Sequence, residues 1–242
     1  MKTFAVLIPT KNEVRNIPNL VQYIDIFDEV IFVDADSTDG TQESIIRNFP
    51  NSKLISQLGY KGKGSALCLG LLEAKSDYVL ILDADLPVSL VEVRYLRELC
   101  SKNESLDLVK TSRHLLGGGS SDLTIIRNTG AKFFALITRL LFRVQWTEMC
   151  YGFWIIKVSR VPELGLLRLL KEPRGLFPFH RIPYGLSFEF DQVIFLRAFK
   201  KKFNILEIAS SEIERTFGKS NLFAPVDGLR TLLVIFKERL TF

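Results

Sequence analysis

The stretch DYVLILDADLP, residues 77–87, places two aspartates directly after an unbroken apolar run. Runs of this kind are typical of strands in a parallel sheet, because helices cover both faces of such a sheet. The chain has a similar arrangement earlier, in EVIFVDADSTDG, residues 29–40. Both runs therefore predict buried strands that end in an Asp-Ala-Asp triplet.

The residues around these two runs alternate between strand-like and helix-like segments. Strands are expected at 3–9, 29–34, 52–57 and 77–83, and helices at 16–24, 41–49 and 65–75. This alternation predicts a doubly wound α/β layer. Ligands of such sheets bind beyond the carboxyl ends of the strands, so we expect both triplets at one rim.

Beyond residue 105 the pattern is less regular. Further strands are expected at 106–113, 151–156, 203–209 and 211–217, helices at 124–144, 188–202 and 224–240, and a glycine-rich loop at 114–122. The last helix is amphipathic. No linker or repeat divides the chain, so we expect one domain over residues 1–242.

The composition is that of a globular protein, with 47% apolar and 24% charged residues. No apolar run predicts a transmembrane helix, and the first residues predict no signal peptide. Three scattered cysteines fit reduced thiols in the cytoplasm. Two histidines cannot form a histidine-rich metal site, so any metal is expected to be bound by carboxylates. The net charge of +5 comes without a nucleic-acid-binding motif, so we expect no nucleic-acid partner.

The two triplets are followed by different kinds of sequence. Leu86-Pro87 ends the second strand, and the next helix is expected to begin near residue 88. Alternating carboxylates at such a strand end can hold Mg²⁺ or Mn²⁺. The first triplet enters the turn Ser-Thr-Asp-Gly-Thr, so Asp36 and Asp39 are expected to accept backbone hydrogen bonds and Asp34 to be free for a ligand.

The glycine-rich stretch GYKGKGSAL, residues 59–67, lets the backbone approach a ligand and supplies two lysines. No GxxxxGK[ST] pattern can be drawn here, which excludes a Walker A loop. A simple tight turn before a helix is the alternative interpretation.

Taken in order, these motifs resemble the family-2 glycosyltransferases of the GT-A fold, nearest the dolichol-phosphate mannose synthase branch. The matching blocks are IPTKNE (8–13), VDADSTDGT (33–41), GKGSAL (62–67), LDADLP (82–87), TSRHLLGGGS (111–120), RN (127–128), TEMCYGFWII (147–156), FEFD (188–191) and ERTFGKSN (214–221). They span nearly the whole chain. The resemblance implies a Rossmann-like, mostly parallel central sheet flanked by helices.

The resemblance also implies roles for matching residues, in four groups. The expected metal ligands, for Mg²⁺ or Mn²⁺, are Asp83 and Asp85. The expected nucleotide-sugar contacts are Pro9, Thr10, Glu13, Asp34, Lys63 and Asp83. The expected acceptor-phosphate contacts are Arg113, Arg127, Arg215 and Lys219. The candidate catalytic residues are Asp85, Glu148 and Asp191. On this basis residues 1–105 are predicted to bind the nucleotide sugar and residues 106–221 the acceptor, before the C-terminal helix at 222–242.

The implied reaction moves a hexose, with inversion, from a GDP-mannose or UDP-glucose type donor to a polyprenyl or dolichyl phosphate. A phosphate oxyanion needs no strong general base, whereas a sugar hydroxyl would need one. A cytosolic transferase acting on a sugar or small-molecule hydroxyl is the first alternative. An inactive nucleotide-sugar-binding scaffold is the second, although retention of Asp83 and Asp85 speaks against it.

Four residues depart from the family pattern. Ala35 and Asp36 stand where the family often has Asp and Gly, and Pro87 where a glutamine often follows the metal pair. Glu148 stands where the family has aspartate. Glu148 can equally be a strand-end carboxylate paired with an arginine, and Asp191 can equally be a favourable charge at a helix N-terminus.

The lipid acceptor implies a protein peripheral to the cytoplasmic face of a membrane, and the family includes members that use a membrane-anchored partner subunit. Two helices could contact the membrane, 132–143 and 224–240, through apolar side chains flanked by basic ones. The expected membrane-facing side chains are Phe133, Phe134, Leu136, Ile137, Leu140 and Leu141 in the first, and Leu229, Leu232, Leu233 and Phe236 in the second. Burial against the core is the alternative for both.

Overall fold

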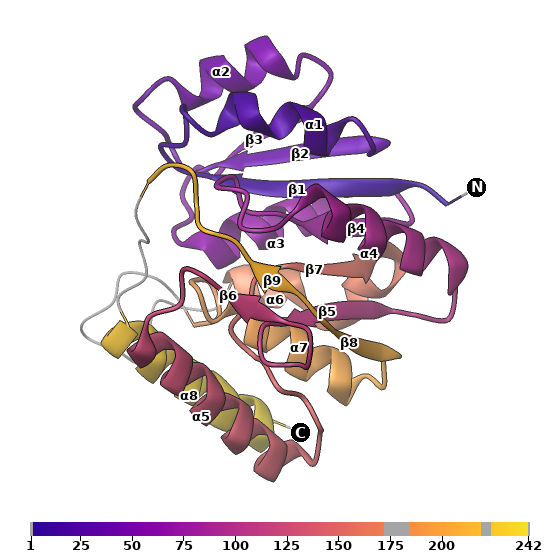
Figure 1. Ribbon diagram of the computed structural model, residues 1–242, viewed down its shortest axis with the longest axis vertical. Coiled ribbons are helices and arrows are strands. Elements are labelled where there is room, and N and C mark those ends of the chain that lie inside the picture. The colour runs from indigo at the N-terminus through magenta and orange to yellow at the C-terminus, as the bar shows by residue number, and fades with distance from the viewer. Residues whose placement is uncertain (1, 172–183, 219–223, 242) are drawn as a thin grey trace.

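The computed structural model describes residues 2–171, 184–218 and 224–241. A seven-stranded sheet lies at its centre, in the order β3-β2-β1-β4-β7-β5-β8 (Figure 1). The strands are β1 (Phe4–Thr10), β2 (Glu29–Asp34), β3 (Lys53–Ser56), β4 (Tyr78–Ile81), β5 (Leu108–Ser112), β7 (Trp154–Lys157) and β8 (Ile205–Ala209). Only β7 of these runs antiparallel to its neighbours, β4 and β5. The predicted α/β fold with a mostly parallel sheet is confirmed.

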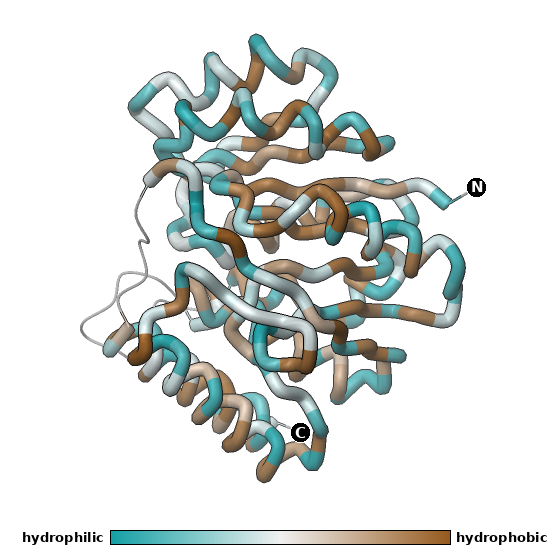
Figure 2. The backbone as a smooth tube through the Cα atoms, in the orientation of Figure 1, coloured by the Kyte–Doolittle hydropathy of each residue, from teal (hydrophilic) through white to brown (hydrophobic). Residues whose placement is uncertain are grey.

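Both faces of the sheet are buried, and alternate side chains of one strand enter different cores. In β1, Ala5 and Leu7 join the core under one helix layer, whereas Val6 and Ile8 join the other. The strands therefore appear as hydrophobic stretches of the backbone tube (Figure 2). This double burial is why the sequence shows continuous apolar runs instead of a polar alternation.

Two helix layers cover the sheet. One layer contains η1 (Ile17–Leu20), α1 (Val21–Ile24), α2 (Thr41–Asn48) and α4 (Leu90–Lys102). The other contains α3 (Lys63–Glu73), η2 (Val158–Leu164), α6 (Leu166–Lys171) and α7 (Phe190–Lys200). Helix α3 crosses β1 closely, because a Cβ at Gly70 would lie only 2.1 Å from Leu7 Cδ1. Ser89 begins α4 with a capping box closed by Glu92, near the start that the sequence predicts.

Two longer helices, α5 (Ile125–Phe142) and α8 (Ala224–Leu240), lie side by side at one end of the molecule (Figure 1). Helix α8 also packs against α7, where buried Glu238 forms ion pairs with Arg197 and Lys200. Within the described part of the chain, no helix is long and apolar enough to cross a membrane.

The predicted boundaries hold for most elements, with four differences. The segment 16–24 is a 3-10 turn followed by one helical turn, and β7 begins at Trp154 instead of residue 151. The segment 211–217 is a strand only over β9 (Ser211–Glu212), which pairs with β6 (Gly119–Ser120) from the predicted loop. The helical turns over 158–171 were not predicted from the sequence.

Candidate functional site

The two aspartate triplets lie at the same edge of the sheet, as predicted. β1 pairs in parallel with β2 on one side and with β4 on the other. Asp34 is the last residue of β2, and Asp83 follows the end of β4 by two residues. The carboxyl ends of these parallel strands therefore present both triplets at one rim.

Asp34 of the first triplet is fully buried, and its carboxylate accepts four hydrogen bonds. Thr10 Oγ1 and Ser37 Oγ donate to Oδ2 at 2.9 and 2.6 Å. Ser37 N and Gln42 Nε2 donate to Oδ1 at 2.9 and 2.6 Å. Since two carboxylate oxygens offer about four acceptor positions, the expectation of a free Asp34 is wrong. A nucleotide contact through Asp34 stays a prediction that requires one of these donors to move.

The other two acids of this segment behave differently from each other. Asp39 accepts hydrogen bonds from the backbone nitrogens of Val14 and Thr41, both at 3.1 Å, so its predicted role as a local acceptor is confirmed. Asp36 is exposed and adopts a left-handed φ of 54°. Its one hydrogen bond within the described residues comes from Ser56 Oγ at 3.4 Å. The prediction that Asp36 is a backbone acceptor is wrong, because Asp34 takes that position.

The second triplet meets cations instead of local donors. Lys63, the first residue of α3, places Nζ 2.7 Å from Asp83. Arg215 Nη1 lies 3.0 Å from Asp85 Oδ2, while Asp85 Oδ1 is buried without a hydrogen-bond partner among the described residues. Burial and the neighbouring Asp83 charge raise the pKa of Asp85 to about 6. Each carboxylate of the pair therefore has one cation beside it, but Asp85 Oδ1 lacks a hydrogen-bond donor among the described residues.

Asp191 stands opposite this pair, at the start of α7. Trp154 Nε1 on β7 donates a hydrogen bond of 2.8 Å to Asp191 Oδ1. Burial raises the pKa of Asp191 to about 6, although the nearby Lys63 ammonium acts against it. Gly152 keeps the space between these groups open, since a Cβ there would lie 3.1 Å from Lys63 Nζ and 3.3 Å from Asp191 Oδ2. Trp154 thus orients Asp191 as well as packing in the core.

The three described arginines of the predicted acceptor group occupy the same region. Arg215 bridges Asp85 and Asp122, with Nη2 2.8 Å from Asp122 Oδ2. Arg127, on α5, lies 3.5 Å from the same carboxylate. Arg113, at the end of β5, is buried between two glutamates. Lys219 lies outside the described residues.

Glu148 is buried in the loop before β7. Its Oε2 is 3.0 Å from Arg113 Nε, and its Oε1 accepts hydrogen bonds from the backbone nitrogens of Met149 and Cys150 at 3.2 and 3.0 Å. Burial alone would raise its pKa, but His114 and Arg113 together lower it to about 2. The arginine-paired interpretation matches this arrangement. A carboxylate with so low a pKa is a weak proton acceptor at neutral pH.

One cavity of about 390 Å³ collects most of the predicted residues. Its charged lining comprises Lys63, Asp83, Asp85, Arg113, Arg127, Asp191, Glu212, Arg215 and Asp227. Its apolar lining comes from α5, from the start of α8 and from residues outside both helices, among them Leu82, Pro87, Tyr151, Phe153 and Phe188. Pro9, Thr10, Glu13, Asp34 and Glu148 do not line it. Glu13 nevertheless interacts electrostatically with the site, since burial and the Asp83 charge raise the pKa of Glu13.

Several residues that line or support this cavity were not predicted as site residues from the sequence. Gly152 and Tyr151 line the cavity from a segment that was predicted as strand. Glu212 reaches Arg113 from β9, and Pro225 and Gly228 bring the C-terminal helix to the cavity wall. Their positions depend on long-range packing, for which the local sequence carries no signal.

Comparison with known proteins identifies the family. Residues 5–156 match the model described as Glycosyl transferase family 2, and the chain belongs to this family. A dolichol-phosphate mannosyltransferase from Pyrococcus furiosus is 32% identical over 144 residues, which cover 56% of this chain and 40% of that protein. A dolichyl-phosphate beta-glucosyltransferase from Trichomonas vaginalis is 31% identical over 119 residues, covering 46% of this chain and 35% of that protein. The chain thus spans less than half the length of these relatives.

Solved structures support the same fold at lower identity. Glucosyl-3-phosphoglycerate synthase from Mycobacterium tuberculosis, crystallised with Mn²⁺, uridine diphosphate and phosphoglyceric acid, superposes with a TM-score of 0.72. It is 16% identical, and the superposition covers 98% of this chain and 78% of that one. A structure of the same enzyme with Mg²⁺ and uridine diphosphate gives a TM-score of 0.70. The predicted GT-A fold is confirmed.

Proposed function

We propose that the chain transfers a hexose, with inversion, from a nucleotide sugar of the GDP-mannose or UDP-glucose type to a polyprenyl or dolichyl phosphate. The observation that carries this proposal is the composition of the cavity. Carboxylates, Lys63 and three arginines line it together with apolar side chains from α5 and α8. An acceptor with an anionic head and an apolar tail matches both kinds of lining.

The curated relatives support the same acceptor class. Their names state a mannosyltransferase and a glucosyltransferase that act with dolichol phosphate or dolichyl phosphate. The aligned residues cover less than half of either relative, so the activity of this chain is inferred from its own cavity together with that similarity.

Asp83 and Asp85 are the residues that would hold Mg²⁺ or Mn²⁺. Asp85 Oδ1 is buried without a hydrogen-bond partner among the described residues, and the pKa of that carboxyl is raised; both features fit a carboxylate that binds a cation. The described residues contain no group of three or more acidic, histidine or cysteine side chains arranged for a metal, so other ligands would come from a diphosphate and water. When bound, such an ion supplies charge neutralisation for the departing diphosphate.

The protein's own groups account for the rest of the transfer. Lys63 supplies positive charge beside Asp83, and the arginines orient the acceptor phosphate toward the sugar carbon. A phosphate oxygen is already an anion at neutral pH, so no side chain has to remove a proton from it. Glu148, with its pKa of about 2, is consistent with a reaction that needs no base there.

A transferase that acts on a soluble hydroxyl acceptor is the second candidate. The structural neighbours favour it, because they were crystallised with phosphoglyceric acid beside uridine diphosphate. In that reaction Asp191 would be the general base, since it lines the cavity and its pKa is raised to about 6. The apolar cavity wall has no role with such an acceptor, and for that reason the lipid phosphate is preferred.

A lipid acceptor also requires contact with a membrane surface, and we propose that α5 and α8 provide it at the cytoplasmic face. Phe133, Leu136 and Leu140 of α5 are exposed, close to Arg139 and Arg143. Of the membrane-facing side chains expected from the sequence in this helix, Phe134, Ile137 and Leu141 pack against the core instead. Helix α8 exposes Leu229, Phe236 and Leu240.

The test is a panel of labelled nucleotide sugars offered with a short-chain polyprenyl phosphate, the matching polyprenol, or phosphoglyceric acid. We expect label to enter the organic phase with the polyprenyl phosphate alone. Label transferred to phosphoglyceric acid or another soluble acceptor would establish the second candidate instead. Binding of the nucleotide sugar without transfer to any acceptor would favour the inactive scaffold.

A further inference from the structure

Arg113 is held in one orientation by groups on two different segments, the loop before β7 and strand β9. Its Nε donates to Glu148 Oε2 and its Nη1 to Glu212 Oε2, each at 3.0 Å. Its guanidinium carbon lies 4.7 Å from the centre of the Tyr151 ring. These contacts leave Nη2 without a hydrogen bond among the described residues, while Arg113 lines the cavity. A guanidinium fixed in this way presents its remaining donors without further ordering.

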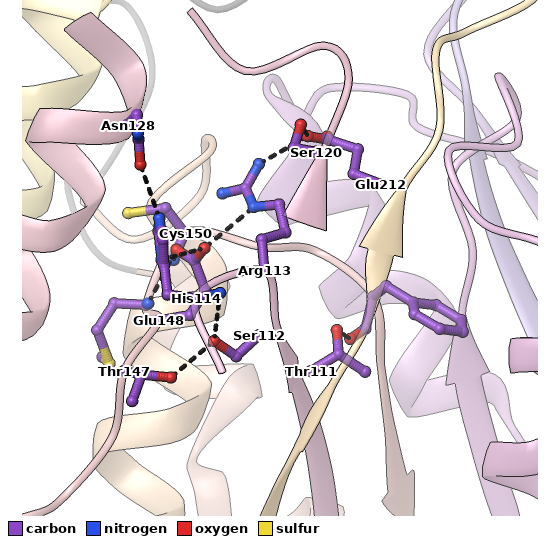
Figure 3. Close-up of polar contacts among 12 residues, drawn as sticks. Thr111, Ser112, Arg113, His114, Ser120, Asn128, Thr147, Glu148, Cys150 and Glu212 are labelled. Atoms are coloured by element: carbon purple, nitrogen blue, oxygen red, sulfur yellow. Dashed lines mark hydrogen bonds and ion pairs between the residues drawn. The ribbon is translucent and has the colours of Figure 1, made fainter. Parts of the chain in front are cut away.

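Glu148 is the centre of this arrangement (Figure 3). Two backbone amides hold its Oε1, and its Oε2 meets both Arg113 Nε and His114 Nδ1, the latter at 3.1 Å. The carboxylate accepts three hydrogen bonds and also lies beside the His114 ring, and its pKa of about 2 keeps it charged. Glu148 therefore acts on other side chains of the protein and does not reach the cavity.

His114 extends the arrangement to the acceptor side of the molecule. Its Nε2 lies 2.9 Å from Asn128 Oδ1, and Asn128 is on α5 directly after Arg127 (Figure 3). Nε2 can donate to Asn128, whereas Nδ1 lies near Glu148 without hydrogen-bond geometry, so that contact is purely electrostatic. Both contacts favour the doubly protonated imidazolium. The Glu148 carboxylate raises the pKa of His114, while burial and the Arg113 charge act against this.

The charges buried around this cluster lead to the same protonation state. Lys110 is fully buried beside Glu207, which also accepts from the backbone nitrogens of Thr147 and Glu148. Three carboxylates, Glu148, Glu207 and Glu212, lie against the cations Lys110 and Arg113. Burial lowers the pKa of Lys110, and the Glu207 charge acts against this. A protonated His114 balances the third negative charge. Buried charges persist when they are paired in this way.

We infer that Glu148 and His114 are positioning residues for the anionic head of the acceptor. Glu148 orients Arg113 so that Nη2 faces the cavity, and His114 ties this guanidinium to α5 beside Arg127. The ligand class that such a pair of arginines recognises is a phosphate monoester. The inference rests on the proposed function, because it assigns the arginines to the acceptor and not to the donor.

The test is Glu148→Gln, which keeps the shape of the side chain and removes the charge that holds Arg113 and His114. We expect KM for a short-chain polyprenyl phosphate to rise about tenfold to a hundredfold, the usual effect of losing a hydrogen bond to a charged group. KM for the nucleotide sugar should change by less than about twofold. Glu238→Gln is the matched control, since it also removes a buried charge but lies at the far end of α8 from the cavity.

A second variant keeps the inference testable if Glu148→Gln does not fold. In His114→Gln, Asn128 on α5 faces a glutamine that does not titrate instead of the histidine. We expect KM of the wild type for the acceptor to rise as pH increases through the pKa of His114, and this dependence to vanish in the variant. In Asn128→Asp, KM for the acceptor should rise at a higher pH than in the wild type, because a carboxylate beside His114 favours the imidazolium and raises the pKa of the ring.

Three results would overturn the inference. An equal rise in KM for donor and acceptor in Glu148→Gln would assign Arg113 to the diphosphate. A loss of kcat with both KM values unchanged would make Glu148 part of the chemical step. A pH dependence that is the same in His114→Gln would exclude the histidine. Binding of the polyprenyl phosphate to wild-type protein by calorimetry separates these results from failure of the proposed function, in which no such binding is seen.

Discussion

Replacing Asp85 with asparagine should abolish transfer and at the same time stabilise the protein without ligands. Asp85 is largely buried beside Asp83, and its pKa is raised from 3.8 to about 6. A raised pKa of a carboxyl group means that its ionised form is less stable in the folded protein than in the unfolded chain. The size of this shift corresponds to roughly 3 kcal/mol of lost stability at neutral pH.

The expected gain in Asp85→Asn is smaller, about 1–2 kcal/mol, because Arg215 loses one of its two carboxylate partners and retains Asp122. The gain should depend on pH. Below about pH 4 the carboxyl is protonated in both states and the variant has no advantage. As pH rises toward about 6, the unfolded chain releases this proton first, so the wild type loses stability relative to the variant.

The assay is urea unfolding of both proteins in a chelating buffer at several pH values, with Asp36→Asn as control because Asp36 is exposed. Transfer activity is measured on the same samples with Mg²⁺ or Mn²⁺ restored. A variant that is less stable than the wild type at neutral pH would show that the Asp85–Arg215 pair outweighs the burial of the charge. Equal loss of activity in Asp36→Asn would refute the different roles of the two triplets.

The remaining predictions concern the acceptor, the base and the membrane. Arg113→Ala and Arg127→Ala should each raise KM for the lipid phosphate about tenfold or more, with donor binding by calorimetry nearly unchanged; a collapse of donor binding would assign them to the diphosphate. Asp191→Asn should retain turnover within about tenfold on a polyprenyl phosphate, because the loss of a true general base costs about 10²–10⁴-fold; a loss of that size would favour a hydroxyl acceptor. Arg139→Glu combined with Arg143→Glu should weaken flotation with anionic vesicles, and wild-type binding should fall as salt rises, since each basic residue contributes about 1 kcal/mol; binding that ignores both changes would exclude this surface.

Hydrophobic patterning predicted the fold well because the sheet is buried on both faces. Strands β1, β2 and β4 each coincide with a nearly continuous apolar run, and each run ends where the polar rim begins. The turn 158–171 was missed because Gly165 and Pro162 interrupt any helical period there. The segment 211–217 was overpredicted because its alternation continues beyond Glu212, where pairing with β6 ends.

The candidate site was predictable only as far as the strands determine it. Asp83 and Asp85 come directly after the end of β4, and Lys63 comes after the glycine turn before α3. The partners of Glu148 could not be predicted, because Arg113 and His114 directly follow β5, 34–35 residues earlier in the chain. Neither the pairing nor the resulting pKa of about 2 has a local signal.

The two Asp-Ala-Asp triplets have the same sequence but different chemical surroundings. After the first triplet, Ser37 and Gln42 supply hydrogen-bond donors to Asp34, and Thr10 adds one from β1. The carboxylate is therefore fully satisfied by its own fold. After the second triplet come Leu86 and Pro87, which offer no side-chain donor, and Pro87 has no backbone N–H. Asp83 and Asp85 take their positive charge from Lys63 and Arg215, and Asp85 Oδ1 has no hydrogen-bond partner among the described residues. For that reason we propose the second triplet, and not the first, as the place for a diphosphate and its metal.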